Sequence, residues 1–501
     1  MKEKTFRMKI VVLASEAVPF SKTGGLADVA GALPRALEAL GHEAILMIPF
    51  HRRFLKPSIV LESVGLNLRV PIGPKIVEGQ VFSTTLEGSK GVVYLIDQPD
   101  YFDRDGLYQS AGVDYHDNFE RFLFFCRASL ETIRLLELAP DVLHCNDWQT
   151  GLTPVYLAEQ YRVRAGLERV GTLLTIHNLA YQGTFSRWAM GLTGLDARLF
   201  NWEQLEFHGK LNCLKAGIVF ADRVSTVSPT YAKEIQTAEF GCGLEGLLSA
   251  RRDQLTGIVN GIDTTVWNPE TDPMIALNYD IATFERGKAA CKAQLQRRSS
   301  LPERPDVPLL AQIGRLDPQK GWDLLAEVAD GLLDLDIQLV ILGEGAPRYH
   351  ELLDRLADKH PGKLRAFLEF SNPLAHQIEA GADLFLMPSL YEPCGLNQLY
   401  SLAYGTIPIV RATGGLADTV VDAAPATLSN KTATGFSFVE PNPRALRGAI
   451  DRALAAFADR STRREIIANG MSRDWSWNRG ASEYAQLYQE ILSLRSSKAA
   501  G

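Results

Sequence analysis

The feature that most constrains the fold is an alternation of short apolar segments with amphipathic segments. Near the start, residues 8–14 are apolar, residues 27–40 carry apolar side chains at helical spacing, and residues 44–48 are apolar again. Gly41 is a typical stop signal at the end of the middle segment. Strands that alternate with helices predict parallel sheets covered by helices on both faces, so the sequence predicts an α/β fold.

This alternation runs along the chain twice. The first series continues with predicted strands at residues 92–96, 142–144, 172–176 and 223–227. Asn260-Gly261-Ile262-Asp263 then has the composition of a turn, and the chain up to about residue 306 is polar and irregular. The second series has strands at residues 309–313, 338–342 and 384–387, another that ends at Val410, and helices at residues 321–333, 348–359 and 443–457. Because 501 residues are too many for one ordinary core, we expect two doubly wound domains, residues 1–257 and 258–475.

Composition argues against several classes of partner. Lys and Arg total 52 against 59 Asp and Glu, a net charge of −7, whereas proteins that bind nucleic acid usually carry a basic field. No stretch approaches the roughly 20 apolar residues that a membrane helix requires. The six cysteines include no C-x-x-C pair, and Glu16 ends the first apolar run too early for a signal peptide. We therefore expect a cytoplasmic protein with neither a nucleic-acid nor a membrane partner; composition does not indicate its oligomeric state.

Two loops with cationic side chains follow predicted strands, at the place where α/β sheets bind ligands. Lys22-Thr23-Gly24-Gly25 precedes the first helix, and its glycines allow backbone N–H groups to approach an anion; a plain turn with an exposed lysine fits equally well. In the second domain, Arg315 follows a strand and Lys320 begins the next helix. Two cations at a helix start suit a diphosphate, and the alternative is a pair of solvated charges.

The segment Glu392-Pro393-Cys394-Gly395-Leu396 follows the strand at residues 384–387. A carboxylate before such a turn can accept hydrogen bonds from sugar hydroxyls, while the amides of Gly395 and Leu396 face a phosphate. The alternative is a Glu that only the helix dipole favours.

Polar side chains also follow strands of the first domain: Glu16, Asp147 and the pair His177-Asn178. Because the carboxyl ends of neighbouring parallel strands meet at one edge of a sheet, we expect these side chains to face one cleft. The hexapeptide Thr-Gly-Gly-Leu-Ala-Asp at residues 23–28 recurs at residues 413–418, which favours a similar glycine turn in each domain facing one shared cleft; the alternative is a coincidence of sequence. Two D-x-D triplets, at residues 103–105 and 334–336, are better explained as turns, so we expect no metal site.

Taken in order, these residues resemble the bacterial glycogen synthase and plant starch synthase family of retaining glycosyltransferases. That family has the GT-B fold, two Rossmann-like domains that face a deep cleft. The motifs that carry the resemblance extend through nearly the whole chain: Lys22-Thr23-Gly24-Gly25-Leu26, Asp147-Trp148, Thr175-Ile176-His177-Asn178, Asn260-Gly261-Ile262-Asp263, Arg315 with Lys320, Glu392-Pro393-Cys394-Gly395-Leu396 and Thr413-Gly414-Gly415-Leu416.

The resemblance implies ADP-glucose as the donor, the non-reducing 4-OH end of an α-1,4-glucan as the acceptor, and transfer with retention. We expect no cofactor and no metal requirement, because Arg315, Lys320 and Lys22 can neutralise the charge of the departing diphosphate. It implies that the catalytic residues are Glu392, His177 and Asp147. The implied donor-binding residues are Lys22, Gly24, Gly25, Arg315, Lys320, Cys394, Gly395, Leu396, Thr413 and Gly414. The implied acceptor-side residues are Glu16, Asn178 and Asn260. The last segment, residues 476–501, is then a helix that crosses back to the first domain.

Two positions depart from the pattern of related enzymes. Many relatives have a His before Asp-Trp, where this chain has Asn146, so we assign Asn146 no catalytic role. Related retaining glycosyltransferases carry a second Glu eight residues after the first, where this chain has Tyr400. The alternative functions are a UDP-sugar-dependent GT-B transferase with another acceptor and a glucan-binding protein without activity.

Overall fold

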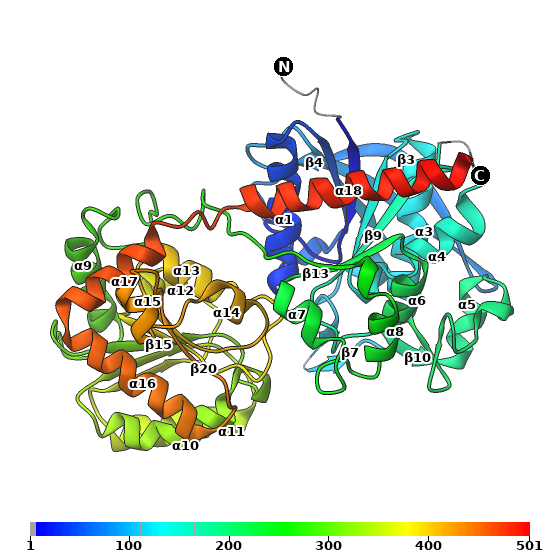
Figure 1. Ribbon diagram of the computed structural model, residues 1–501. Coiled ribbons are helices and arrows are strands. Elements are labelled where there is room, and N and C mark those ends of the chain that lie inside the picture. The colour runs from blue at the N-terminus through cyan, green and yellow to red at the C-terminus, as the bar shows by residue number, and fades with distance from the viewer. Residues whose placement is uncertain (1–6, 111, 165, 501) are drawn as a thin grey trace. The chain divides into compact units, whose positions relative to one another are not determined.

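The computed structural model describes residues 7–110, 112–164 and 166–500, which form two compact units (Figure 1). Unit 1 comprises the chain up to Val227, then Ala232–Asn260, and finally the segment from Trp477 onward. Unit 2 comprises Ser228–Tyr231 and Gly261–Ser476. The chain thus leaves unit 1 after Asn260 rather than after residue 257, and no local pattern predicts that Ser228–Tyr231 pack with unit 2.

The nine-stranded sheet of unit 1 is organised around its first strand. β1 (Lys9–Leu13) pairs in parallel with β2 (Glu43–Pro49) on one side and with β8 (Val142–Asn146) on the other. From β2 the sheet continues through β5 (Val92–Asp97), and from β8 through β9 (Gly171–Ile176), β13 (Arg223–Thr226) and β14 (Leu255–Gly257). The order of strands therefore reverses between β1 and β8, and such switch points are where open α/β sheets bind ligands.

One edge of this sheet differs from the prediction of a parallel sheet. β3 (Glu62–Ile72) and β4 (Lys75–Thr85) form an antiparallel hairpin, and β4 also pairs antiparallel with β5. Every second residue over much of β3 and β4 is exposed, so these strands lack the continuous apolar run by which the buried strands were recognised. A further small sheet, also unpredicted, consists of β10 (Thr184–Ser186), β12 (Lys210–Asn212) and β11 (Glu206–Phe207).

The last helix belongs to unit 1, as predicted. α18 (Trp477–Ala500) contacts α1 (Gly25–Ala39) and crosses it in the view of Figure 1. The predicted apolar face of α18 is buried, and the Tyr488 hydroxyl lies 2.8 Å from Nδ1 of the buried His144 in β8. The other helices of unit 1 include α3 (Asn118–Leu135), α4 (Thr153–Tyr156), α6 (Cys213–Phe220) and α8 (Glu245–Ala250).

Unit 2 contains a six-stranded sheet in which all pairs are parallel. The order is β17 (Leu364–Phe367), β16 (Gln338–Leu342), β15 (Leu309–Ile313), β18 (Leu384–Met387), β19 (Ile407–Arg411) and β20 (Phe436–Phe438). The order reverses between β15 and β18, which is the switch point of this unit.

Both faces of this sheet are covered, as expected for a doubly wound domain. Leu310 and Leu339 lie in one apolar cluster with side chains of α10 (Trp322–Leu333), α11 (Pro347–Lys359), α16 (Pro443–Ala458) and α17 (Arg460–Met471). Their chain neighbours Leu309 and Val340 lie in a second cluster with side chains of α12 (Asn372–Gly381). Successive strand residues point to opposite faces, and here both faces are buried.

The segment predicted to be irregular up to about residue 306 contains a fifteen-residue helix, α9 (Phe284–Arg298). Its buried side chains include Lys288 and Lys292, so it lacks the apolar stripe on which the prediction depended. Lys292 forms an ion pair with Asp383 at 2.7 Å, and Lys288 donates to Thr406 at 2.7 Å. These polar partners make burial of the lysines possible.

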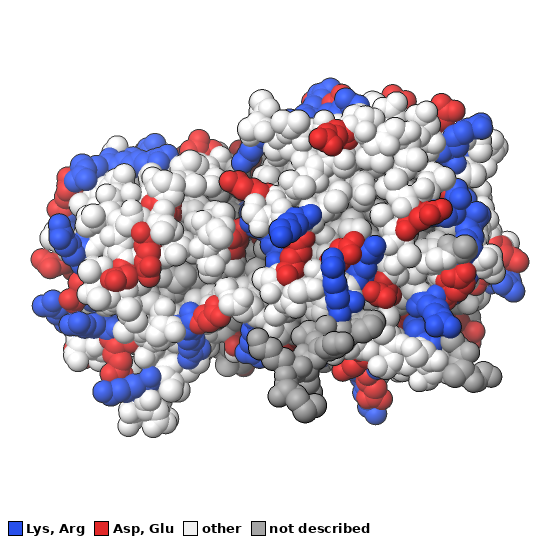
Figure 2. All heavy atoms as spheres, turned by 90° about the horizontal axis from the view of Figure 1, so that it is seen from above, with Lys and Arg blue, Asp and Glu red and all other residues white. Residues whose placement is uncertain are grey.

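Charged side chains of both signs are interspersed on the face drawn in Figure 2. This distribution agrees with the balanced composition and the small negative net charge. That face offers no extended basic field of the kind that binds nucleic acid.

Candidate active site

The switch point of unit 2 brings together the carboxylate and one of the cations that were predicted from separate loops. Glu392, in the loop after β18, is 6% exposed. Its Oε2 accepts hydrogen bonds from Lys320 Nζ at 2.7 Å and from Ser389 Oγ at 2.9 Å. Two partners on one oxygen fix the orientation of the carboxylate.

The loop after β15 carries both predicted cations. Arg315 lies in an ion pair with Asp317 at 3.2 Å and donates to Gln319 at 3.1 Å, while its side chain keeps 56% of its surface exposed. Asp317 also accepts from the backbone N–H of Lys320 and so caps the short helix η7 (Pro318–Lys320). Because β15 and β18 are paired, Arg315 and Lys320 follow one strand and Glu392 follows its neighbour.

The second glycine turn lies against the Glu392 loop. The backbone N–H of Gly415 donates to the carbonyls of Glu392 and Pro393, both at 3.1 Å. Gly414 has φ of +44°, and a Cβ added there would lie 1.9 Å from the Glu392 carbonyl oxygen. Thr413 precedes α14 (Gly414–Thr419) as its N-cap residue and is buried. Only glycine therefore allows the two loops to approach this closely.

The remaining predicted donor residues of unit 2, Cys394, Gly395 and Leu396, precede α13 (Asn397–Ala403). Cys394 is buried, and Gly395 has φ of +72°. The first residue of α13, Asn397, donates through its side chain to the Ile313 carbonyl at the end of β15, at 2.8 Å. The start of α13 thus ties together the loops that follow β15 and β18.

At the switch point of unit 1, Glu16 follows β1 and holds the first glycine loop. Its carboxylate accepts from the backbone N–H of Thr23 and from the Thr23 hydroxyl, the latter at 2.8 Å. Burial raises the pKa of Glu16 to about 7, and the hydrogen bonds from Thr23 offset part of the rise. Lys22 pairs with Asp28 at 2.7 Å, and Gly24 and Gly25 form the start of α1.

Asp147 follows β8 with an unusual backbone conformation, φ of +57° and ψ of −173°. Its Oδ1 accepts from the backbone N–H of His177, after β9, at 2.7 Å. Burial raises the pKa of Asp147 to about 7, against backbone hydrogen bonds from His177 and Asn178 that lower it. A carboxylate kept in this strained position is typical of functional sites.

Asn146, to which the sequence assigned no role, contacts His177. Its Nδ2 donates to the Leu13 carbonyl at 3.0 Å, so its Oδ1 is the acceptor that lies 2.8 Å from His177 Nε2. His177 Nε2 must then carry the hydrogen, which leaves Nδ1 as an acceptor. Burial lowers the pKa of His177 to about 3, so the imidazole is neutral. Asn146 orients His177 from a strand end, and its place beside Asp147 was the signal available in the sequence.

Of the other two predicted acceptor-side residues, Asn178 follows His177 after β9, and Asn260 is the last residue of its segment of unit 1. Asn178 Oδ1 accepts from the backbone N–H of Ala180 at 3.1 Å. Asn260 is 6% exposed, and its Oδ1 has no hydrogen-bond partner among the described residues.

Aspartates of both D-x-D triplets form ion pairs with arginines. Asp103 and Asp105 both pair with Arg53, and Asp336 pairs with Arg304. Among residues 7–110, 112–164 and 166–500, no group of three or more His, Cys, Asp and Glu side chains is arranged to hold a metal ion. In the same part of the chain, no helix is both long and apolar enough to cross a membrane.

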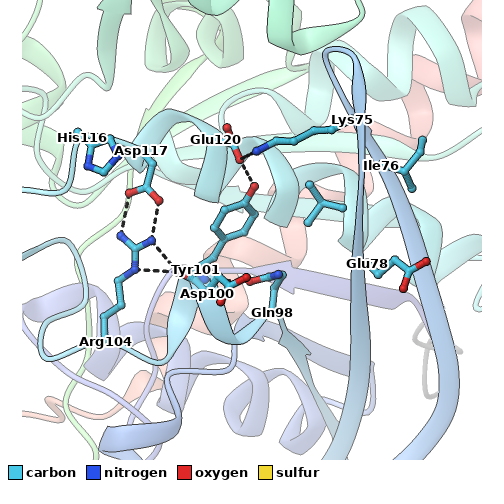
Figure 3. A pocket seen from close by; sticks show the side chains of 11 residues that line it. Lys75, Ile76, Glu78, Gln98, Asp100, Tyr101, Arg104, His116, Asp117 and Glu120 are labelled. Carbon is cyan, nitrogen blue, oxygen red and sulfur yellow. Dashed lines mark hydrogen bonds and ion pairs between the residues drawn. The ribbon is translucent and has the colours of Figure 1, made fainter.

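A separate hollow of about 480 Å³ on unit 1 is lined by β4, α2 (Pro99–Phe102) and the start of α3 (Figure 3). Several of its charged groups are turned toward one another: Arg104 pairs with Asp117 at 2.6 Å, and Glu120 accepts from Lys75 and Tyr101. Because the hollow includes none of the strand-end residues, we do not regard it as the active site.

Comparison with known proteins identifies the class. The family model "Starch synthase catalytic domain" matches residues 9–250, and the model "Glycosyl transferases group 1" matches residues 294–473. With an α/β unit in each region and polar side chains at each switch point, the chain is a glycosyltransferase of the GT-B fold.

Full-length relatives narrow the class to a family. The chain is 45% identical to glycogen synthase of Rhodopirellula baltica, covering 99% of this chain and 100% of the relative, and 47% identical to glycogen synthase of an Anaeromyxobacter species, covering 97% and 100%. It belongs to the glycogen synthase and starch synthase family.

Solved structures agree with this assignment. The catalytic domain of starch synthase IV from Arabidopsis thaliana, bound to ADP and acarbose, is 33% identical and superposes with a TM-score of 0.91, covering 97% of this chain and 100% of that one. Sucrose-phosphate synthase from Thermosynechococcus elongatus, at 19% identity and a TM-score of 0.58, shares the fold alone.

Proposed function

We propose that this glycosyltransferase moves glucose from ADP-glucose to the non-reducing 4-OH end of an α-1,4-glucan, with retention and without a metal ion. The observation that carries the proposal is the contact of Lys320 with Glu392 at the switch point of unit 2, beside Arg315. A cation for phosphate next to a carboxylate for sugar hydroxyls is what a nucleotide-sugar requires. The similar starch synthase IV was bound to ADP and acarbose, which supports the choice of donor and acceptor.

In the proposed reaction, the bond between the glucose C1 and the diphosphate breaks, and negative charge develops on the departing ADP. Lys320 and Arg315 neutralise that charge; at an effective dielectric constant of about 20, one cation about 4 Å from a phosphate contributes about 4 kcal/mol of attraction before desolvation. Glu392 Oε2 is held by Lys320 and Ser389, so Oε1 can accept from a glucose hydroxyl.

The acceptor hydroxyl must lose a proton as it attacks. A neutral His177, whose pKa lies near 3, binds a sugar through hydrogen bonds and does not deliver a proton as an imidazolium. In a front-face substitution the leaving phosphate oxygen takes the proton of the acceptor hydroxyl, so that no covalent enzyme intermediate is required. The role of Asp147 beside the reacting sugar stays a prediction. The donor-binding roles of Lys22, Gly24 and Gly25 stay predictions.

Incorporation of labelled glucose into glycogen tests the proposal. The protein should transfer glucose from ADP-glucose at a much higher kcat/KM than from UDP-glucose, and digestion with an α-1,4-specific glucosidase should release the label. Preference for UDP-glucose would favour the alternative transferase. No transfer from either donor, together with retention on a glycogen column, would indicate a glucan-binding protein without activity.

A further inference from the structure

Tyr400 is a feature that the proposed reaction does not use. It stands eight residues after Glu392, in α13. The Tyr400 ring stacks on the indole of Trp267 with centroids 3.8 Å apart and an interplanar angle of 14°. Tyr400 is only 6% exposed, so its side chain packs inside unit 2.

The indole of Trp267 lies between two rings. The His376 imidazole is also 3.8 Å from it, with an angle of 8°. Two rings cannot occupy the same face at these distances, so His376 of α12 and Tyr400 of α13 cover opposite faces. Trp267 ends a turn that begins at Asp263, since its backbone N–H donates to the Asp263 carbonyl at 2.8 Å. The segment after residue 260 is thereby inserted between two helices of unit 2.

A buried carboxylate fixes this three-ring stack. Asp272 Oδ2 lies 2.7 Å from His376 Nδ1 and accepts from the Tyr404 hydroxyl, also at 2.7 Å. Asp272, His376 and Tyr404 are each 2% exposed or less. Hydrogen bonds from both neighbours lower the pKa of Asp272 against the effect of burial. The imidazole therefore cannot turn without leaving a buried carboxylate short of a partner.

The helix on the other side of the stack carries the loop of the candidate site. Gln398 in α13 donates through Nε2 to the carbonyls of Cys394 and Gly395, both at 3.1 Å. Asn397 holds the end of β15, as described above. With only seven residues, Asn397–Ala403, α13 is too short to be stable alone, so its position is set by what packs on it.

We propose that Trp267 is a positioning residue for the nucleotide-sugar site. The stack of Trp267 with His376 and Tyr400 fixes the position and rotation of α13. The start of α13 in turn fixes the conformation of the loop that carries Glu392 beside Lys320. The inference rests on the proposed function, since it treats this loop as the donor site. Trp267 itself touches no substrate in this scheme.

ADP affinity of full-length variants, measured by calorimetry, tests the inference. Trp267→Leu keeps an apolar side chain but removes the planar ring from the stack. It should weaken ADP binding about tenfold, because small displacements of the groups that bind a ligand lower its affinity. Trp267→Phe keeps a plane between His376 and Tyr400 and should bind within about threefold of the unsubstituted protein. In turnover assays, the KM for ADP-glucose should rise in Trp267→Leu while the KM for glycogen is unchanged.

The matched control is Phe457→Leu, which truncates a buried ring in α16 of the same unit; this ring lies against the cationic groups of Lys292 and Arg463 and is not part of the Trp267 stack. It should lower the melting temperature without changing ADP affinity. If Trp267→Leu melts lower but binds ADP as tightly as the unsubstituted protein, the stack serves stability alone and the inference is wrong. If Trp267→Leu does not fold, Tyr400→Leu against Tyr400→Phe decides by the same comparison. Failure of the proposed function gives a different result, because the unsubstituted protein would then neither bind ADP nor transfer glucose from ADP-glucose.

Discussion

Glu392→Gln should separate the two tasks that the carboxylate of Glu392 performs. The substitution keeps the size of the side chain and removes its charge. In the structure, the carboxylate and Lys320 Nζ are 2.7 Å apart, and opposite charges at that distance attract by about 6 kcal/mol at an effective dielectric constant of about 20, before desolvation. A phosphate that binds Lys320 must compete with this attraction.

The magnitude follows from the same geometry. A phosphate on Lys320 lies about 5 Å from the carboxylate, and like charges at that separation repel by about 3 kcal/mol at the same dielectric constant. Water and salt screen most of this in a partly exposed site, so we expect a net gain of about 1 kcal/mol, or ADP binding about fivefold tighter in Glu392→Gln. Turnover should fall by a factor of about 10² to 10³, because a charged contact to the reacting sugar is lost.

Calorimetry with ADP and initial rates with ADP-glucose measure the two effects in one preparation. Lys320→Met is the matched control, since it removes the other half of the ion pair and should weaken ADP binding. Salt dependence gives a further check, because the tighter binding in Glu392→Gln should shrink at high ionic strength. The reasoning is refuted if Glu392→Gln weakens ADP binding and lowers turnover by the same factor, since Glu392 would then serve only to organise Lys320.

Three further predictions concern other parts of the structure. In Glu16→Gln, stability relative to the unsubstituted protein should improve by about 2 to 3 kcal/mol between pH 5 and pH 8. The folded pKa of the Glu16 carboxyl, near 7, lies above its ordinary value of 4.5, so the unsubstituted protein loses stability as the pH rises from 4.5 through 7 and the buried carboxyl must ionise. Denaturant titrations at both pH values measure this difference, which would be absent if the carboxyl were not buried. Gly414→Ala should reduce activity at least about tenfold and lower the melting temperature, because its Cβ meets the Glu392 carbonyl; unchanged kinetics in a folded variant would contradict the close approach of the two loops. Activity should survive excess EDTA, and complete loss that magnesium or manganese restores would show that a metal ion replaces the role given to Arg315 and Lys320.

Much of the fold follows from local patterns in the sequence. Buried parallel strands are continuous apolar runs, so β15, β16 and β18 lie where the sequence predicts them. The hairpin β3–β4 and the helix α9 were missed for opposite reasons. The hairpin has one exposed face, whereas α9 buries lysines whose partners, such as Asp383, come from distant segments. No local pattern shows such partners.

The candidate site is predictable to the level of loops but not of contacts. Topology places the ends of parallel strands at one edge, so Arg315, Glu392 and Asp147 could be assigned to strand ends from the sequence alone. The contact between Lys320 and Glu392 depends on the pairing of β15 with β18. The sequence of neither segment indicates the order of the strands in the sheet. The orientation of His177 by Asn146 likewise depends on the pairing of β8 with β9.

The return of α18 to unit 1 has a consequence for how the protein is made. A ribosome releases the chain from its N-terminus, and domains usually fold in the order in which they emerge. Here the helix that covers β1 and the start of unit 1 emerges last, after the whole of Gly261–Ser476. Unit 2 can therefore complete its core while the first domain to be synthesised still exposes apolar surface that α18 will bury. Unit 1 is thus begun before unit 2 but completed after it, and exposed apolar surface of this kind is what makes folding intermediates prone to aggregation.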